Sequence, residues 1–140
     1  MSKVRHVLGI SGGKDSAALA IYLKRLYPQL PIEYYNTDTK CELAETEKLI
    51  ENLKSYLGHI EILVAAEDSP EPTPFDHFLK ISGGYLPSPQ ARWCTQKMNL
   101  WVMILQYRMS GFEVMRIERD MFQPSLIFRL YSHSGKTFGV

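Results

Sequence analysis

The spacing of apolar positions changes several times between Arg5 and Ile81. Short apolar runs typical of buried strands alternate with longer segments in which apolar residues recur every three or four positions. Glu42–Leu57 shows the clearest helical spacing, and Gly58 follows as the residue expected at a helix end. The pattern predicts strands at Arg5–Ile10, Ile32–Asn36 and Ile60–Ala65, and helices at Asp15–Tyr27, Glu42–Leu57 and Phe75–Ile81. This alternation is typical of an α/β fold with a parallel sheet and helices on both faces.

The segment between the first strand and the first helix carries the strongest functional pattern, Ser11-Gly12-Gly13-Lys14-Asp15-Ser16. Adjacent glycines let the backbone adopt positive φ and approach a ligand, and the N-terminus of the following helix favours an anion. Ser11 and Ser16 add hydroxyl donors, Lys14 adds a positive charge, and the Asp15 carboxylate is suited to Mg²⁺. We therefore predict a phosphate site at the carboxyl end of the first strand, where open α/β sheets bind their ligands.

This loop is not a Walker A loop. That motif needs four residues between its glycines and then Lys followed by Ser or Thr. Gly9 and Gly13 are separated by only three residues, and Lys14 is followed by Asp15. The hexapeptide instead resembles the PP-loop of the ATP pyrophosphatase superfamily. The resemblance implies binding of ATP with Mg²⁺ and cleavage between the α- and β-phosphates, with Lys14 and Asp15 as catalytic residues.

Two further segments resemble one branch of that superfamily, the 3′-phosphoadenylylsulfate (PAPS) reductase-like proteins. The segment Tyr35-Asn36-Thr37-Asp38-Thr39 closes the second strand with the turn Thr37-Asp38-Thr39, and Glu42 lies just beyond it. This segment is similar to the stretch that recognises adenosine in this branch. Its residue types also suit a capped turn before a helix, and that alternative stays open. The second segment, Arg92-Trp93-Cys94-Thr95-Gln96-Lys97, is similar to the Arg-x-Cys-Thr…Lys signature.

In that signature, Arg92 and Lys97 suit an anionic group and are implied as catalytic. We expect Thr95 to cap the following helix while its hydroxyl donates to the same anion. Cys94 is either a nucleophile or a packed side chain. The implied fold is the adenine nucleotide alpha hydrolase-like, Rossmann-like arrangement. The resemblance is to sulfonucleotide reductases and DNA phosphorothioation enzymes. It therefore leaves two alternatives for a partner, a sulfur donor protein and a nucleic-acid substrate. The C-terminal Glu-Cys-Gly-Leu-His segment of true reductases is not in this sequence, so we do not predict reductase activity.

Residues 1–98 follow the family pattern, whereas residues 99–140 do not. The family is expected to supply a strand Tyr-Val-Gly-Ile-Arg followed by an acidic loop. Codons permitted for Met109–Met121 spell that strand and loop when the frame is shifted by one base. We therefore predict a frameshift near Leu100, which would leave a truncated domain with an atypical, poorly ordered tail. Without the later strands of the family, the sheet would be incomplete and one edge would lack a partner.

Composition changes this picture little. The 140 residues include 16 basic and 15 acidic side chains, and the net charge of +1 favours neither a nucleic acid nor a membrane surface as partner, without excluding a nucleic-acid substrate. Residues 1–6 lack the apolar core of a signal peptide, and no apolar run approaches the roughly 20 residues of a membrane span. We expect a cytoplasmic protein that binds a nucleotide. It is either an active enzyme or an inactive nucleotide-binding fragment, and a plain interaction module has the least support.

Overall fold

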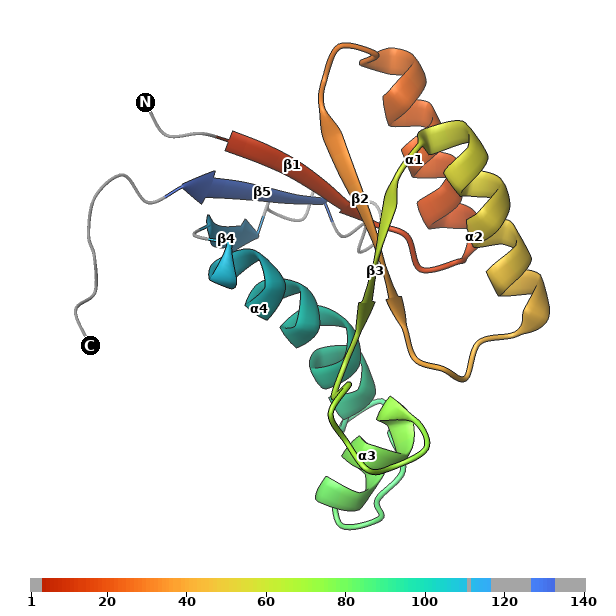
Figure 1. The fold of residues 1–140 in the computed structure, drawn as a ribbon, viewed down its shortest axis with the longest axis vertical. Helices are drawn as coiled ribbons and strands as arrows, with labels where there is room; N and C mark the ends of the chain where they lie inside the picture. Colours follow the sequence, from red (N-terminus) through yellow and green to blue (C-terminus); the bar gives the residue numbers. More distant parts are fainter. Residues whose placement is uncertain (1–3, 111, 117–126, 133–140) are drawn as a thin grey trace.

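The computed structural model describes residues 4–110, 112–116 and 127–132 of the chain. They form a five-stranded sheet with the strand order β3-β2-β1-β5-β4 (Figure 1). The strands span Val4–Gly9 (β1), Ile32–Asp38 (β2), Ile60–Val64 (β3), Phe112–Arg116 (β4) and Ile127–Ser132 (β5). Strands β1, β2 and β3 are parallel, as the alternating pattern predicts. The prediction of a parallel sheet is wrong for the other two, because β5 is antiparallel to β1 and β4 is antiparallel to β5.

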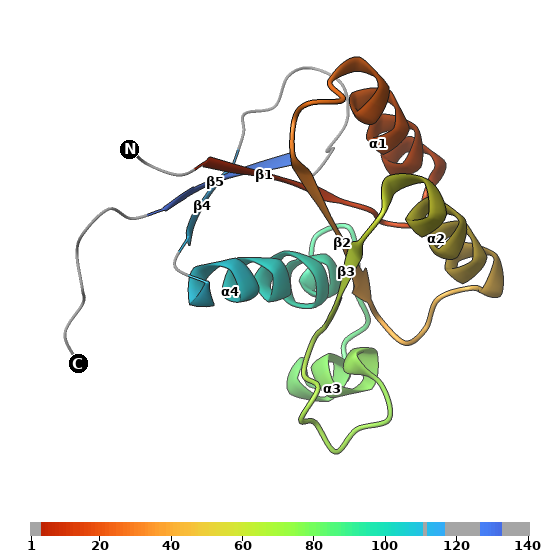
Figure 2. The ribbon, with the colours of Figure 1, turned by 45° about the horizontal axis from the view of Figure 1, so that its top comes forward.

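Helices cover both faces of the parallel strands, which confirms the α/β architecture. The helical segments are α1 (Lys14–Leu26), α2 (Ala44–Leu57), α3 (Pro74–Ile81), the π-helical turn η1 (Thr95–Leu100) and α4 (Trp101–Met109). Figures 1 and 2 show α1 and α2 on one side of the sheet and α4 on the other. Leu8 and Tyr34 pack in the core beneath α1 and α2, whereas their neighbours Val7 and Tyr35 pack against Met103 of α4. Successive strand residues point to opposite faces, so a sheet that is buried on both sides needs continuous apolar runs.

Strand β5 occupies the edge beside β1 that we expected to lack a partner. It pairs with β1 from Val4 opposite Tyr131 to Leu8 opposite Ile127. The expectation of an uncovered edge here is therefore wrong, because an antiparallel strand can satisfy the backbone groups of β1 as well as a parallel one. The predictions of a frameshift and of a poorly ordered tail at 99–140 stay predictions. Residues 111, 117–126 and 133–140 of that tail lie outside the described residues.

The boundaries of the elements differ from the predicted ones by one or two residues. Helix α2 begins at Ala44 rather than Glu42, because the Glu42 carboxylate accepts a hydrogen bond from Thr39 Oγ1 at 2.8 Å within the preceding turn. It ends as predicted at Gly58, which has φ +95° and donates its N–H to Lys54 O. No helix in the described ranges has the length and apolar character needed to cross a bilayer.

Candidate functional site

The predicted phosphate loop lies between the end of β1 and the start of α1, and its two serines tie its ends together. The backbone N–H of Ser11 donates to Ser16 Oγ at 3.2 Å, and the two hydroxyl oxygens lie 3.1 Å apart. Ser16 Oγ also donates to Gly13 O at 3.1 Å. These contacts hold the loop in a closed turn. The two serines thus act on loop shape in addition to the donor role predicted for them.

Gly12 can be replaced by no other residue without strain. Its φ is +78°, a conformation that L side chains rarely adopt, and a Cβ placed on it would lie 2.3 Å from Thr46 Cγ2. Thr46 belongs to the first turn of α2, so this helix packs directly against the loop. The glycine predicted from the motif is therefore required both by the turn and by a close approach from a second element.

The N-terminus of α1 is open beside the loop. Its N-cap residue is Gly13, and no side chain caps the helix. Lys14 and Asp15 are exposed, and neither makes an ion pair or a side-chain hydrogen bond within the described residues. The first-turn N–H groups and the positive end of the helix dipole are therefore available to an anion, with the Lys14 ammonium beside them.

The end of β2 is connected to the phosphate loop by the side chain of Asn36, a contact that the sequence did not predict. Asn36 Nδ2 donates to Ile10 O at 2.6 Å, and Ile10 directly precedes Ser11. The segment Thr37-Asp38-Thr39 therefore lies at the same sheet edge as the loop. The sequence predicts a turn here, but Thr37 and Asp38 are the last residues of β2 and only Thr39 lies beyond the strand.

The capped-turn alternative is confirmed for the turn itself, because Asp38 Oδ1 accepts the Lys40 N–H at 2.7 Å and Thr39 Oγ1 accepts the Cys41 N–H at 3.4 Å. It is wrong for the helix start, since the N-cap of α2 is Leu43 with no side-chain hydrogen bond.

Asp38, the last residue of β2, forms an ion pair and a hydrogen bond with Lys40 of the following turn. Its carboxylate accepts the Lys40 backbone N–H at 2.7 Å and lies 2.9 Å from Lys40 Nζ. Partial burial alone would raise the pKa of Asp38, but the hydrogen bonds from Lys40 outweigh it and lower the pKa. Asp38 is consequently a carboxylate at neutral pH, suited to accept hydrogen bonds from hydroxyl groups.

A cavity of about 300 Å³ opens between the end of β2, Ile62 of β3 and the face of α2 from Thr46 to Lys54. Asn36 and Thr46 line it, and these two side chains are also the ones that contact the phosphate loop region. Asp38, Glu42, Glu47 and Glu51 add carboxylates to its wall. The cavity therefore adjoins the loop and has an acidic lining.

The segment Arg92–Lys97 reaches the same sheet edge through η1. Thr37 Oγ1 donates to Asn99 Oδ1 at 2.9 Å, which connects the end of β2 to this π-helical turn. π-Helical turns are frequent at functional sites. Among the described residues, neither Arg92 nor Lys97 forms a hydrogen bond or ion pair with the phosphate loop. Arg92 is exposed, and Lys97 Nζ instead lies over the Phe78 ring, 5.8 Å from its centroid.

Trp93, Cys94 and Met98 pack in a small core with Ala65 and residues of α3. Cys94 is half-buried there, and its Sγ lies 3.9 Å from Thr95 Oγ1. This environment favours the packed alternative for Cys94. The expectation that Thr95 caps the next helix is wrong, because η1 starts at Thr95 after Cys94, and no side chain caps it.

The described residues contain no group of three or more His, Cys, Asp or Glu side chains that could hold a metal ion. Asp15 is a single exposed carboxylate at the loop. Mg²⁺ in nucleotide sites is commonly held by one or two carboxylates together with phosphate oxygens. The donor set therefore fits a Mg²⁺ ion that arrives with a nucleotide, and not a cage made by protein side chains.

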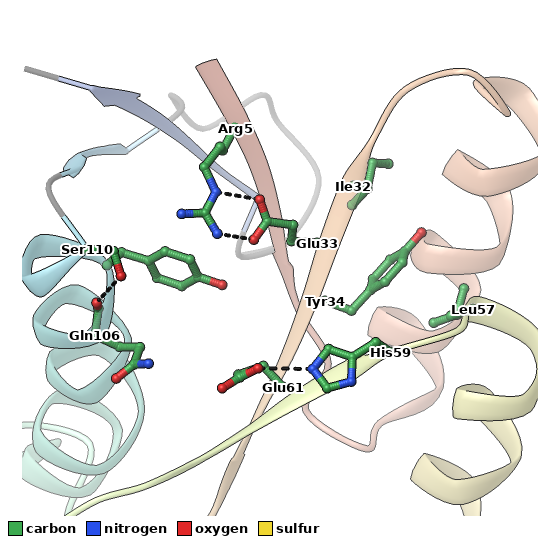
Figure 3. A pocket seen from close by; sticks show the side chains of 10 residues that line it. Arg5, Ile32, Glu33, Tyr34, Leu57, His59, Glu61, Gln106 and Ser110 are labelled. Carbon is green, nitrogen blue, oxygen red and sulfur yellow. Dashed lines mark hydrogen bonds and ion pairs between the residues drawn. The ribbon is translucent and has the colours of Figure 1, made fainter. Parts of the chain in front are cut away.

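A second cavity, of about 330 Å³, lies near the amino ends of the parallel strands, far from the loop end of β1 (Figure 3). Its charged groups pair with one another. Arg5 Nε donates to Glu33 Oε1 at 2.5 Å, and His59 Nε2 lies 3.0 Å from Glu61 Oε2. The Arg5 guanidinium also lies over the Tyr107 ring. An incoming ion would have to disrupt these pairs, so the cavity beside the loop is the better candidate site.

Thr46 and Asn99 are the site residues that the sequence did not predict, and for Asn36, which lies in the adenosine-like segment, the hydrogen bond to Ile10 was not predicted. Asn36 and Asn99 each stand as a polar residue beside an apolar run, which is a weak signal. Thr46 follows the apolar spacing of α2, so no sequence signal marks its contact with Gly12.

Comparison of the chain with protein-family models, with curated protein sequences and with solved structures finds no match in any of the three. The functional argument therefore rests on the residues and geometry of the site.

Proposed function

We propose that this chain is an adenine nucleotide-binding protein of the PP-loop, PAPS reductase-like kind, with the adenine nucleotide alpha hydrolase-like fold. In that function it cleaves ATP between the α- and β-phosphates to adenylate an acceptor. The observation that carries the proposal is the loop Ser11–Ser16, which lies between a buried parallel strand and an uncapped helix N-terminus. The parallel three-strand unit with helices on both faces is compatible with this fold.

The residues of the loop suit the chemistry of phosphate transfer. Ser11, Gly12, Gly13 and Ser16 would surround the phosphates, and Lys14 would neutralise the charge that develops on the leaving pyrophosphate. In the reaction, an acceptor oxygen bonds to the α-phosphorus as the α–β anhydride bond breaks, and its electron pair leaves with pyrophosphate. Asp15 would hold Mg²⁺, which supplies further charge neutralisation. The cavity beside Asn36 and Thr46 would receive the nucleoside, with Thr37, Asp38 and Thr39 at its margin.

Binding of Mg²⁺–ATP by isothermal titration calorimetry tests the first part of the proposal. Lys14→Ala should weaken ATP binding about tenfold or more, because a hydrogen bond to a charged group contributes about 1.5–3 kcal/mol. Lys48→Ala is the matched control, since Lys48 is exposed on α2 and lies outside the cavity lining. An equal effect of the two substitutions, or no ATP binding by the unmodified chain, would refute the proposal.

Release of pyrophosphate from ATP tests the catalytic part, with candidate sulfonucleotide and nucleic-acid acceptors added in turn. Asp15→Asn should abolish release, whereas Asp68→Asn, which makes the same change at an exposed loop position, should not.

A nucleotide-binding role without turnover is the second candidate. It is favoured by one observation, the position of Lys97 over Phe78 and away from the loop. Tight ATP binding with no pyrophosphate release under any of these conditions would support this candidate over the enzyme.

A further inference from the structure

The first peptide group of the phosphate loop is held by hydrogen bonds at both of its ends. Its carbonyl, which belongs to Ile10, accepts a hydrogen bond from Asn36 Nδ2 at 2.6 Å. Its N–H, which belongs to Ser11, donates to Ser16 Oγ at 3.2 Å. Because a peptide group is planar, these two bonds together fix the orientation of one rigid unit. The loop therefore begins from a defined peptide plane.

Asn36 supplies its hydrogen bond at the point where the backbone pairing of β1 with β2 stops. The paired residues end at Gly9 opposite Tyr35, and the Ile10 N–H donates to Tyr35 O at 2.7 Å. The carbonyl of the same residue, Ile10, accepts from the next side chain along β2. A carbonyl oxygen can only accept, so the amide nitrogen of Asn36 is the atom that faces it. The contact therefore needs a donor on the side chain at this position of β2.

The loop depends on this contact because its own backbone is permissive. Gly12 and Gly13 follow Ser11 directly, and Gly12 has φ +78°. Glycine reaches both positive and negative φ, so the glycine pair does not by itself fix where the N–H groups of the loop point. Ile10 is only 2 % exposed, and a buried carbonyl needs a hydrogen-bond partner. Loss of the Asn36 amide would release the peptide plane from which the loop starts.

We propose that Asn36 is a positioning residue for nucleotide binding, whose amide orients the Ile10–Ser11 peptide group and, through it, the phosphate loop. It acts on the loop before a ligand arrives. A site that is already ordered binds more tightly, because binding does not have to order it. This inference rests on the proposed nucleotide-binding function and adds to it a residue that lies outside the loop and on another strand.

Asn36→Asp tests the inference, because it changes the hydrogen-bonding groups and keeps the shape of the side chain. A carboxylate cannot donate to the Ile10 carbonyl, whereas a protonated carboxyl group can. Calorimetry at about pH 8 should show Mg²⁺–ATP binding about tenfold weaker than that of the unmodified chain. At about pH 5 the ratio of the two dissociation constants should fall below about threefold, because partial burial and neighbouring carboxylates raise the pKa of the new carboxyl group.

Two variants show whether the pH dependence comes from the donor. Asn36→Leu has no donor at any pH, so its binding should be about tenfold weaker at both pH values. Asn52→Asp makes the same charge change at an exposed position of α2 outside the cavity lining, and it should leave binding unchanged. The cavity that Asn36 lines also carries the charged groups of Asp38, Glu42, Glu47, Glu51 and Lys54. They are present in every variant, so their titration cancels in the ratios.

Pyrophosphate separates positioning of the loop from a direct contact between Asn36 and the nucleoside. It has phosphate groups and no nucleoside, so only an effect on the loop reaches it. Asn36→Leu should weaken binding of Mg²⁺–pyrophosphate by the same factor as binding of Mg²⁺–ATP. Unchanged pyrophosphate binding by this variant, or none by a chain that binds ATP, would overturn the inference.

A stability control separates positioning from a general effect on the fold. Ile60→Val removes a buried methylene group at the amino end of β3, the end away from the loop, so it should lower the free energy of unfolding and leave ATP binding unchanged. Urea denaturation would establish that each variant is folded under the assay conditions. Failure of both Asn36 variants to fold would overturn the inference, since Asn36 would then serve the fold itself.

The remaining outcomes distinguish this inference from the proposed function. Three results would overturn the inference and leave nucleotide binding standing: equal weakening by Ile60→Val, weakening by Asn36→Asp that does not depend on pH, or no effect of either Asn36 variant. Failure of the unmodified chain to bind ATP would overturn both.

Discussion

Replacement of Gly12 by Ala should damage the phosphate loop through two separable effects. The first is conformational, because an L side chain at φ +78° costs about 1–2 kcal/mol. The second is steric, because the new methyl group would lie 2.3 Å from Thr46 Cγ2, and relief of such an overlap costs about 1–3 kcal/mol. We expect the free energy of unfolding to fall by about 2–5 kcal/mol in total, the sum of these two costs.

Two further variants separate these contributions. Gly84 also has positive φ, +80°, but nothing lies within 4 Å of a Cβ placed there. Gly84→Ala should therefore show the conformational cost alone, about 1–2 kcal/mol. In a chain that already carries Thr46→Ala, Gly12→Ala should lower the free energy of unfolding by about as little as Gly84→Ala does, because the methyl group of Thr46 is no longer present.

Urea denaturation followed by circular dichroism measures all of these free energies, and calorimetry with Mg²⁺–ATP reports on the loop. Gly12→Ala should also abolish detectable ATP binding, whereas Gly84→Ala should leave it unchanged. If Gly12→Ala costs no more than Gly84→Ala, or if Thr46→Ala does not relieve it, the close packing of α2 on the loop is not what constrains this glycine.

Three further predictions concern the packing around the site. Met103→Ala should lower the free energy of unfolding by about 2–5 kcal/mol, because Met103 of α4 is fully buried against the sheet, whereas Met109→Ala, at an exposed position of the same helix, should change it little by the same denaturation assay. Burial, with the nearby Glu33 carboxylate, raises the pKa of Tyr107 from its ordinary value of 10 to about 12. The folded state therefore binds the Tyr107 hydroxyl proton more tightly than the unfolded state does. The stability that this proton contributes should be complete below pH 10 and lost as the pH rises toward 12. Tyr107→Phe should flatten that part of a profile of melting temperature against pH. Thr37→Val should remove the hydrogen bond to Asn99 and lower the free energy of unfolding by about 1 kcal/mol. Amide hydrogen exchange should become faster in η1 and stay unchanged in α1, which would identify the effect as local.

The predicted order of strands and helices agrees with the structure from Val4 to Ile81, because burial on two faces leaves a local signature. The apolar runs of β1 and β2 place Val7 and Leu8, and Tyr34 and Tyr35, on opposite faces, and the spacing of α2 follows one buried stripe. The loop Ser11–Ser16 could also be predicted, because its glycines meet a conformational requirement of the backbone that lies within six residues. The boundaries are less certain, as the Thr39–Glu42 hydrogen bond at the start of α2 shows.

The arrangement beside β1 could not be read from the chain. Residues 99–140 show no clean period, and pairing of β5 with β1 depends on backbone groups that every sequence possesses. An antiparallel strand there satisfies those groups without the crossover helix that the alternating pattern predicts. The direction of the strand was therefore decided by the path of the chain.

The sequence by itself determined the α/β order of elements and the glycine turn Ser11–Ser16 between β1 and α1, since both follow from contacts within a few residues. That this turn binds phosphate stays a prediction. Tertiary structure decided what adjoins that loop. The packing of Thr46 on Gly12, the hydrogen bond from Asn36 to Ile10 and that from Thr37 to Asn99 each join residues on different elements. These contacts bring an acidic cavity against the loop, and no local pattern specifies them, because they depend on how whole helices pack against the sheet.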